Sequence, residues 1–255
     1  MDKNFINLWD LKNLPLTELI GNYDPSIQNF DQSLIMSSQT GHVQLANKLP
    51  SEILYTESDY SYRTGTVFKS NQKIQGFIDF FNKSTSQDNF NCIIDVGGND
   101  LTLAKYLRNK TKRCFVIDPL CASMDGETID GIRVIGKIVE KVDLRELKPE
   151  VVVCRHTLEH IENTKIFFEQ LFDQCPSDCI YIFEVPDFDC LIESLRFDAI
   201  FHQHLHYFSL STLTNLIIEC GGEVTDHFYN YQGPCGGSLF VSFKKSNKKN
   251  LGLVN

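Results

Sequence analysis

No cysteine precedes Cys92 in this chain of 255 residues, and the nine cysteines that the chain does have include no Cys-x-x-Cys pair. Such a sequence offers no good ligand set for a structural zinc ion, and we expect no bound metal. Basic residues are also in deficit, because 24 lysines and arginines stand against 33 acidic residues and leave a net charge of −9. That deficit argues against a nucleic-acid substrate.

Sequence features for reaching a membrane are lacking as well. No apolar stretch attains transmembrane length, and the start, Met-Asp-Lys-Asn-Phe, has neither the basic residues nor the cleavage site of a signal peptide. Several cysteines lie inside apolar runs typical of strands, where an unpaired thiol behaves as a small hydrophobe. We therefore predict a reduced, cytoplasmic protein that binds no membrane.

The most informative motif is Cys-Ile-Ile-Asp-Val-Gly-Gly-Asn-Asp, residues 92–100. A buried strand that ends in an acidic residue and paired glycines is typical of a turn around a nucleotide. Gly97 and Gly98 have no Cβ, so the backbone can bend sharply there and approach a ligand closely. An apolar helical pattern begins near Asp100, and the free N–H groups of that helix would point at the same ligand.

A second apolar run, Cys-Phe-Val-Ile, ends at Asp118-Pro119, 21 residues beyond Gly97. A carboxylate at this place in a nucleotide-binding sheet accepts hydrogen bonds from ribose hydroxyls. The two runs together predict an adenosine compound as ligand. The predicted contacts are Asp95, Gly97, Gly98, Asn99, Asp100, Asp118 and Pro119.

The same loop lacks the glycine pattern of a dinucleotide site. G-x-G-x-x-G admits a pyrophosphate, whereas this loop reads Gly-Gly-Asn-Asp-Leu, and Asp100 would repel phosphates at close range. S-adenosylmethionine carries a sulfonium and an ammonium instead, which Asp95 and Asp100 would attract. We predict S-adenosylmethionine as the cofactor, with a nicotinamide cofactor and a glycine turn that binds nothing as the alternatives.

Strands and helices alternate along the rest of the chain, which predicts a parallel sheet with helices on both faces. The predicted strands are 132–135, 151–154 and 179–183, and the predicted helices are 163–174 and 209–220. Two further β-rich runs, 223–231 and 238–243, form an antiparallel hairpin, a familiar ending for class I methyltransferases. Ligands bind outside the carboxyl ends of such strands, so Arg155, His156 and Glu184 should join Gly97 and Asp118 around one crevice.

Histidines gather in the segment after the strand 179–183. His202, His204 and His206 alternate there, in the densest polar and aromatic stretch of the chain. A single histidine is usually structural, but three at the mouth of a cofactor crevice predict at least one catalytic role. His160, which follows the strand 151–154, should face the same opening unless it packs locally at the start of a helix.

Several segments carry a resemblance to a known family: residues 182–187, 196–211 and 236–239, together with 40–47, 54–55 and 59–65. They resemble the sugar methyltransferases typified by the NDP-hexose C-methyltransferases, over about residues 14–243. The resemblance implies an α/β fold with a Rossmann-like class I methyltransferase sheet. It also implies a small N-terminal module that carries zinc-binding cysteines and supplies tyrosines to the active site.

The resemblance further implies roles for individual residues. A histidine base is implied at His204, with a polar residue beside it at Gln203, a second histidine at His160, and a tyrosine at Tyr60 or Tyr62. His202 belongs to the same segment as the base. The candidate catalytic residues are therefore Tyr60, Tyr62, His160, His202, Gln203 and His204.

The sequence departs from the family in three places. Ser37 and Thr40 stand where cysteines are expected, so the zinc module is degenerate. Phe-His-Gln-His at 201–204 replaces the family's Tyr-His-Glu-His, and an amide cannot act as a carboxylate. We also expect no counterpart of the family's second nucleotide-fold domain, which is implied to help hold the nucleotide sugar.

We expect an N-terminal module at 1–68, a domain for S-adenosylmethionine at 69–246 and a tail at 247–255. Methylation of a sugar carbon requires an enolised ketosugar, whereas methylation of a hydroxyl requires only a base and an in-line approach. We therefore predict O-methylation of a nucleotide-activated or polysaccharide-precursor sugar. The alternatives are C-methylation of a nucleotide-linked 4-ketosugar and a non-catalytic partner of another methyltransferase, and monomer and homo-oligomer both stay open.

Overall fold

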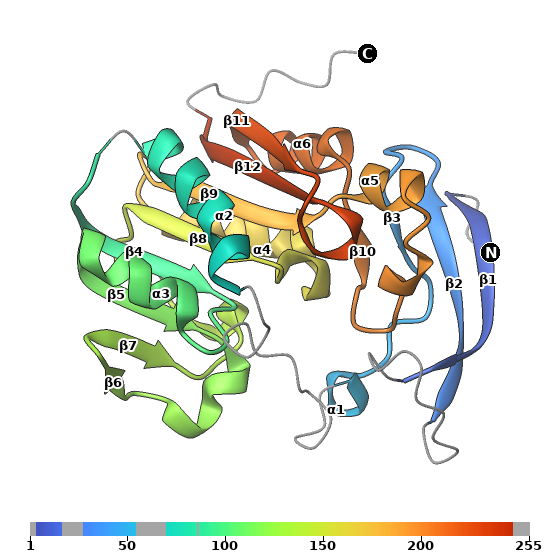
Figure 1. The fold of residues 1–255 in the computed structure, drawn as a ribbon, viewed down its shortest axis with the longest axis horizontal. Helices are drawn as coiled ribbons and strands as arrows, with labels where there is room; N and C mark the ends of the chain where they lie inside the picture. Colours follow the sequence, from blue (N-terminus) through green and yellow to red (C-terminus); the bar gives the residue numbers. More distant parts are fainter. Residues whose placement is uncertain (1–3, 17–27, 55–69, 86, 247–255) are drawn as a thin grey trace.

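The computed structural model describes residues 4–16, 28–54, 70–85 and 87–246. These residues form two sheets (Figure 1), one of eight strands in the order β11-β12-β9-β8-β4-β5-β7-β6 and one of four in the order β1-β2-β3-β10. The predicted tyrosines Tyr60 and Tyr62 lie outside the described residues. In the part of the chain that is described, no helix is both long enough and apolar enough to span a bilayer.

The large sheet is built around a parallel centre. Its parallel strands are β4 (Phe90–Val96), β5 (Thr111–Ile117), β7 (Ile132–Ile135), β8 (Val151–Arg155) and β9 (Ile180–Pro186). The antiparallel strands are β12 (Ser238–Lys245), β11 (Gly222–Asn230) and the short β6 (Thr128–Ile129). The predicted mostly parallel sheet with a C-terminal hairpin is thereby confirmed.

The strand order creates a reversal beside β4. The chain runs outward from β4 through β5 to β7 and then returns to β8 on the other side of β4. Ligands of open α/β sheets bind at such a switch point, outside the carboxyl ends of the two strands that flank it. The loops that follow β4 and β8 therefore meet where a ligand is expected.

Helices cover both faces of this sheet because its strands are buried on both sides. Along β4, Ile93 faces the core formed with α2 (Ser70–Thr85) and α3 (Thr102–Leu107). Its neighbours Cys92 and Ile94 face the opposite core, formed with α4 (Thr164–Gln174) and α6 (Leu210–Glu219). Figure 1 shows α2 and α3 in front of the sheet and α4 behind it.

Polar caps fix where the two rear helices begin. The Asn163 side chain accepts a hydrogen bond from the N–H of Ile166 at the start of α4. Ser209 and Thr212 exchange side-chain and backbone hydrogen bonds as a capping box at the start of α6. Each cap satisfies a backbone N–H group that has no partner inside its helix, and both helices begin where the sequence predicted.

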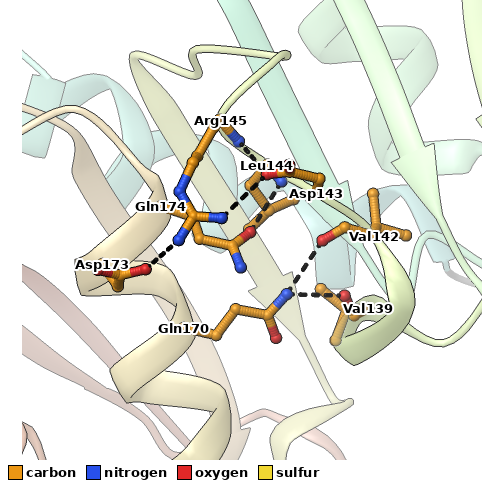
Figure 2. Close-up of polar contacts among 8 residues, drawn as sticks. All are labelled: Val139, Val142, Asp143, Leu144, Arg145, Gln170, Asp173 and Gln174. Carbon is orange, nitrogen blue, oxygen red and sulfur yellow. Dashed lines mark hydrogen bonds and ion pairs between the residues drawn. The ribbon is translucent and has the colours of Figure 1, made fainter.

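Side chains of α4 also hold the segment that leads from β7 to β8 (Figure 2). The Gln170 amide donates to the carbonyls of Val139 and Val142 at 3.1 and 3.0 Å. The Gln174 side chain accepts from the N–H of Leu144 at 2.9 Å. These bonds give the segment the backbone partners that a regular helix would otherwise supply.

The four-stranded sheet joins the N-terminal region to the histidine-rich segment. Its strands are β1 (Phe5–Pro15), β2 (Asn29–Ser37), β3 (Val43–Leu45) and β10 (His206–Tyr207), and the short helix α1 (Ser51–Leu54) follows β3. Leu34, Val43 and Leu45 pack in one core with residues that follow β9, among them Leu191 of α5 (Phe188–Glu193) and Tyr207. The N-terminal region therefore packs directly against the segment that holds the candidate base.

Candidate functional site

The predicted turn after β4 has backbone conformations that few residues adopt. Gly97 has φ +75°, and Asn99 and Leu101 also have positive φ, at 43° and 64°. A Cβ on Gly97 would lie 1.9 Å from the Oγ1 atom of Thr157, which follows β8. Two facts therefore require glycine at position 97. Its φ is one that other residues rarely adopt, and Thr157 occupies the place where a Cβ would lie.

Asp118 ties the glycine turn to the loop after β5. Its Oδ2 atom accepts a hydrogen bond from the N–H of Asn99 at 2.8 Å, and its Oδ1 atom accepts one from the N–H of Leu120 at 2.8 Å. Burial raises the pKa of Asp118, while these two backbone donors act in the opposite direction. Pro119 begins the 3-10 turn that follows. The two loops predicted to share one ligand are therefore directly bonded to each other.

Asp100 and Asp95 were also predicted to contact the cofactor, and both make contacts within the protein. Asp100 accepts hydrogen bonds from the N–H and the hydroxyl of Thr102, at 3.2 and 2.6 Å, and so begins α3. Asp95 lies beneath Gly98 with 1% of its surface exposed, and burial raises its pKa to about 8. The Asp95 carboxyl is therefore mostly protonated at neutral pH, which removes most of the attraction for a sulfonium expected from the sequence.

Arg155 and His156, also predicted to contact the cofactor, belong to a buried chain of charges. Arg155 is ion-paired with Glu184 on the adjacent strand, and His156 Nε2 lies 3.0 Å from the other oxygen of Glu184. His156 Nδ1 lies 3.6 Å from Glu159. Burial would lower the pKa of His156, but Glu184 and Glu159 outweigh it and raise that pKa to about 9. The side chains of both predicted residues are thus committed to protein partners.

His160 and His204, far apart in sequence, lie together. Their ring centroids are 5.0 Å apart. His160 Nδ1 donates to the carbonyl of Gln203 at 2.8 Å, and His204 Nδ1 donates to the carbonyl of Ala199 at 3.1 Å. No described residue bonds the Nε2 atom of either ring. Burial lowers the pKa of His204 to about 3, so this imidazole is neutral at physiological pH.

Glu159 completes this group, which we call the Glu159 cluster: Glu159, His160 and His204. One ligand atom from each residue lies within 4.8 Å of the others. Burial would raise the pKa of Glu159, but the nearby His156 ring, 3.6 Å away, and the neighbouring His160 outweigh it and hold that pKa below its ordinary value. Glu159 was not among the residues predicted from the sequence. Its position beside His160 after a strand was a usable signal, but the pairing with His204 is set by the fold.

Backbone hydrogen bonds connect the Glu159 cluster to the four-stranded sheet, which we also call the N-terminal sheet. The N–H of Leu45 in β3 donates to the carbonyl of Leu205 at 3.0 Å, and the N–H of Leu205 donates to the carbonyl of Glu159 at 2.8 Å. Leu205 directly follows His204, so a single hydrogen-bonded path connects β3 to both halves of the cluster. The strand β3 thereby connects the 3-10 turn at Leu158–His160 to the segment that precedes β10.

The remaining candidates lie outside the cluster. His202 Nε2 lies 3.1 Å from the carbonyl of Leu14, and its ring packs on Phe30, so this residue contacts strands β1 and β2. His206 Nδ1 lies 2.9 Å from His42 Nε2, which pairs the third histidine of the segment with the N-terminal region. Of the three alternating histidines, only His204 reaches His160.

The cofactor residues and the cluster are neighbours. His160 is close enough to Asp118 for its charge to act on the pKa of that carboxyl. Thr157, which packs on Gly97, lies three residues before His160 on the same loop. The glycine turn, Asp118 and the Glu159 cluster therefore lie in one region of the molecule.

Comparison with known proteins gives a family and a fold. A family model described as a methyltransferase domain matches residues 68–227. The chain is 26% identical over 156 residues to the C-methyltransferase NovU of Streptomyces niveus, a match that covers 58% of this chain and 36% of that protein. The chain thus spans about a third of the length of this curated relative.

Solved structures share the fold at low sequence identity. The N-methyltransferase NodS of Bradyrhizobium japonicum matches with a TM-score of 0.53 and 10% identity, over 71% of this chain and all of that chain. The 1,6-didemethyltoxoflavin-N1-methyltransferase of Burkholderia thailandensis, solved with S-adenosylhomocysteine, matches with a TM-score of 0.53 and 11% identity, over 69% of this chain and 79% of that chain. The predicted Rossmann-like class I methyltransferase fold is confirmed.

Proposed function

This chain belongs to the methyltransferase domain family, and on that premise we propose that it transfers the methyl group of S-adenosylmethionine to an oxygen atom of a sugar. The acceptor would be a small molecule, a nucleotide-activated sugar or a polysaccharide precursor, in the cytoplasm. One observation carries the proposal: the rings of His160 and His204 lie together, with centroids 5.0 Å apart, and His160 is close to Asp118. Dependence on S-adenosylmethionine itself follows from the family and fold.

On the cofactor side, the residues from Gly97 to Asp100 and Asp118 would hold the nucleoside. Each Asp118 oxygen already accepts one backbone N–H and can accept one further hydrogen bond from a ribose hydroxyl. Arg155 and His156 would contribute indirectly, because their ion pairs with Glu184 hold the carboxyl ends of β8 and β9 together. This division of roles leaves the Glu159 cluster for the acceptor.

On the acceptor side, the sugar hydroxyl would attack the methyl carbon in line with the carbon–sulfur bond that breaks. The oxygen gains the methyl group and loses its proton, and S-adenosylhomocysteine leaves as the neutral thioether. The hydroxyl proton would pass to a nitrogen of the cluster, with His204 or His160 as the acceptor. Gln203, whose backbone carbonyl holds His160, would orient that ring.

C-methylation of a nucleotide-linked ketosugar is the second candidate. The similarity to NovU, a C-methyltransferase, favours it. That reaction removes a proton from carbon, and the enolate oxygen needs a hydrogen-bond donor or a cation near it. Glutamine in place of a carboxylate at position 203 removes one acidic group from the family pattern, which supports oxygen as the acceptor atom.

The proposal is tested by transfer from S-adenosylmethionine labelled with ¹³C in its methyl group to UDP-, GDP-, CDP- and dTDP-sugars. Mass spectrometry would detect transfer, and carbon NMR of the product would identify the atom that carries the label. We expect a methoxy signal. A methyl on a ring carbon would establish the second candidate, and S-adenosylhomocysteine binding without transfer to any sugar would favour a non-catalytic partner protein.

A further inference from the structure

The Glu159 cluster has the composition and spacing of a metal-ligand set. Two imidazoles and one carboxylate converge, with one ligand atom from each inside a span of 4.8 Å. A zinc ion bound by such ligands lies about 2.0–2.2 Å from each, which requires the three atoms to draw together by about an ångström.

The two rings are already oriented for coordination. Metal-binding histidines commonly donate one ring N–H to a backbone carbonyl, which fixes the ring and leaves the other nitrogen for the metal. His160 and His204 both show this arrangement, with Nδ1 on the carbonyls of Gln203 and Ala199 at 2.8 and 3.1 Å. In both rings the nitrogen left for a ligand is Nε2.

The carboxylate supplies an independent indication. Glu159 is 1% exposed, and neither of its buried oxygens has a hydrogen-bond partner among the described residues. The nearest described cationic group is the His156 ring, at 3.6 Å, which is beyond hydrogen-bond distance. The ion pair with His156 offsets part of the charge but leaves both oxygens without a hydrogen bond. Buried polar atoms in that state are costly, and a ligand that bonds directly to Glu159 would satisfy them.

We propose that Glu159, His160 and His204 bind one divalent cation of the first transition series, such as Zn²⁺ or Co²⁺. Imidazole ligands favour this class of cation over Mg²⁺ or Ca²⁺, which prefer oxygen ligands throughout. Two histidines and a glutamate also form the ligand set of catalytic zinc sites that keep one position open. No metal was predicted from the sequence, which has no cysteine pair, because the three ligands come from two segments that are distant in the chain.

The open position would face the acceptor, a consequence that rests on the proposed function. An acceptor oxygen bound there would lose its proton more easily, because a divalent cation lowers the pKa of a coordinated hydroxyl. The two Nε2 atoms would then hold the cation and not the proton. Cation binding itself does not depend on the identity of the acceptor and can be measured without one.

The experiment is a titration of the purified, chelator-treated protein with Co²⁺, followed by visible absorption and by calorimetry. We expect one Co²⁺ per chain, displaced by Zn²⁺. Glu159→Gln and His204→Asn should weaken binding by more than the roughly 10–100-fold cost of losing an indirect partner of a metal. Asparagine suits position 204 because its amide can still donate to the carbonyl of Ala199, while it offers no atom at the place of Nε2.

Two matched control variants test whether a loss of Co²⁺ binding is specific to the Glu159 cluster. Glu162→Gln and His227→Asn replace exposed residues of the same types and should bind Co²⁺ as the unmodified protein does. Retained binding of S-adenosylhomocysteine by Glu159→Gln and His204→Asn would show that these variants fold. Unchanged Co²⁺ affinity in both cluster variants would overturn the proposal, as would failure of the unmodified protein to bind Co²⁺.

X-ray absorption of the Co²⁺-loaded protein gives a test that needs no variant. We expect only nitrogen and oxygen neighbours, with the scattering pattern of two imidazoles. A sulfur neighbour would mean that the cation binds to cysteines and would also overturn the proposal. Both results are independent of methyl transfer, so the failure of this site and the failure of the proposed function can be told apart.

Discussion

Asp118 is the residue on which cofactor binding should depend most. Asp118→Asn keeps the shape of the side chain but removes its charge and one of its two acceptor oxygens. A hydrogen bond to a charged group contributes about 1.5–3 kcal/mol, so we expect affinity for S-adenosylhomocysteine to fall by at least about tenfold. Calorimetric titration measures the change, with the exposed Glu127→Gln as control. Equal affinity in Asp118→Asn and the control would place the cofactor elsewhere.

Asp95 should make stability depend on pH. Burial raises its folded-state pKa to about 8 from an ordinary value of 3.8, so between these values the folded protein holds a proton that the unfolded chain releases. The free energy of unfolding should therefore fall as the pH rises through this window, by up to about 1.4 kcal/mol per pH unit. Raising the pH favours the unfolded state because the ionised carboxyl is solvated only there.

Asp95→Asn removes this titration and should be more stable than the unmodified protein near pH 8, with the difference shrinking toward pH 4. Chemical denaturation without cofactor, at several pH values, measures it. The exposed Asp88→Asn serves as a control for a simple loss of charge. A constant difference between Asp95→Asn and the unmodified protein across the window would show that Asp95 is ionised in the fold.

At the scale of elements, the contacts of α4 with the segment after β7 should contribute measurably to stability. Gln170→Leu leaves the carbonyl of Val142 without a donor among the described residues, while the carbonyl of Val139 keeps the N–H of Val142. An unsatisfied buried polar group costs about 1–3 kcal/mol. Arg145→Ala breaks exposed ion pairs in the same region and should cost at most about 1 kcal/mol. Denaturant unfolding compares the two variants, and an equal loss in both would contradict this ranking.

The elements that the sequence predicted well are those with one dominant signal. Buried strands such as 92–96 and 151–154 read as continuous apolar runs, and helices that begin at Ser209 or Asn163 carry their caps in the sequence. The strands β1 and β2 were not predicted. They are half-exposed, and irregular pairing between Asn7 and Trp9 interrupts the alternation that marks a strand.

The same distinction applies to the candidate site: residues that directly follow a predicted strand were found, and residues brought together only by the fold were not. Gly97 and Asp118 follow predicted strands directly, so strand order alone brings them together. Glu159 and His160 meet His204 only because backbone bonds through Leu205 join two loops that lie 44 residues apart. No local pattern specifies such a contact. The assignment of Asp100 to the cofactor likewise missed its bond to Thr102, a turn that begins α3.

At the scale of the whole molecule, the N-terminal sheet should support catalysis without contacting the cofactor. Leu45 is fully buried, and its backbone N–H holds Leu205 beside the cluster. Leu45→Ala should cost about 2–5 kcal/mol of stability and lower methyl transfer more than affinity for S-adenosylhomocysteine. Leu216→Ala, in the partly buried packing of α6, is the control for general destabilisation. Equal effects of the two variants on methyl transfer would show that the N-terminal sheet has no specific role in catalysis.

The division of the site into a cofactor part and an acceptor part is tested most directly by His204→Asn. Single-turnover methyl transfer and S-adenosylhomocysteine affinity would be measured on the same sample, with His227→Asn as control. We expect cofactor affinity to stay within about twofold and transfer to fall by roughly 10²–10⁴-fold, the usual contribution of a residue that handles the proton. Transfer near the unmodified rate in His204→Asn would contradict the assignment of the Glu159 cluster to the acceptor.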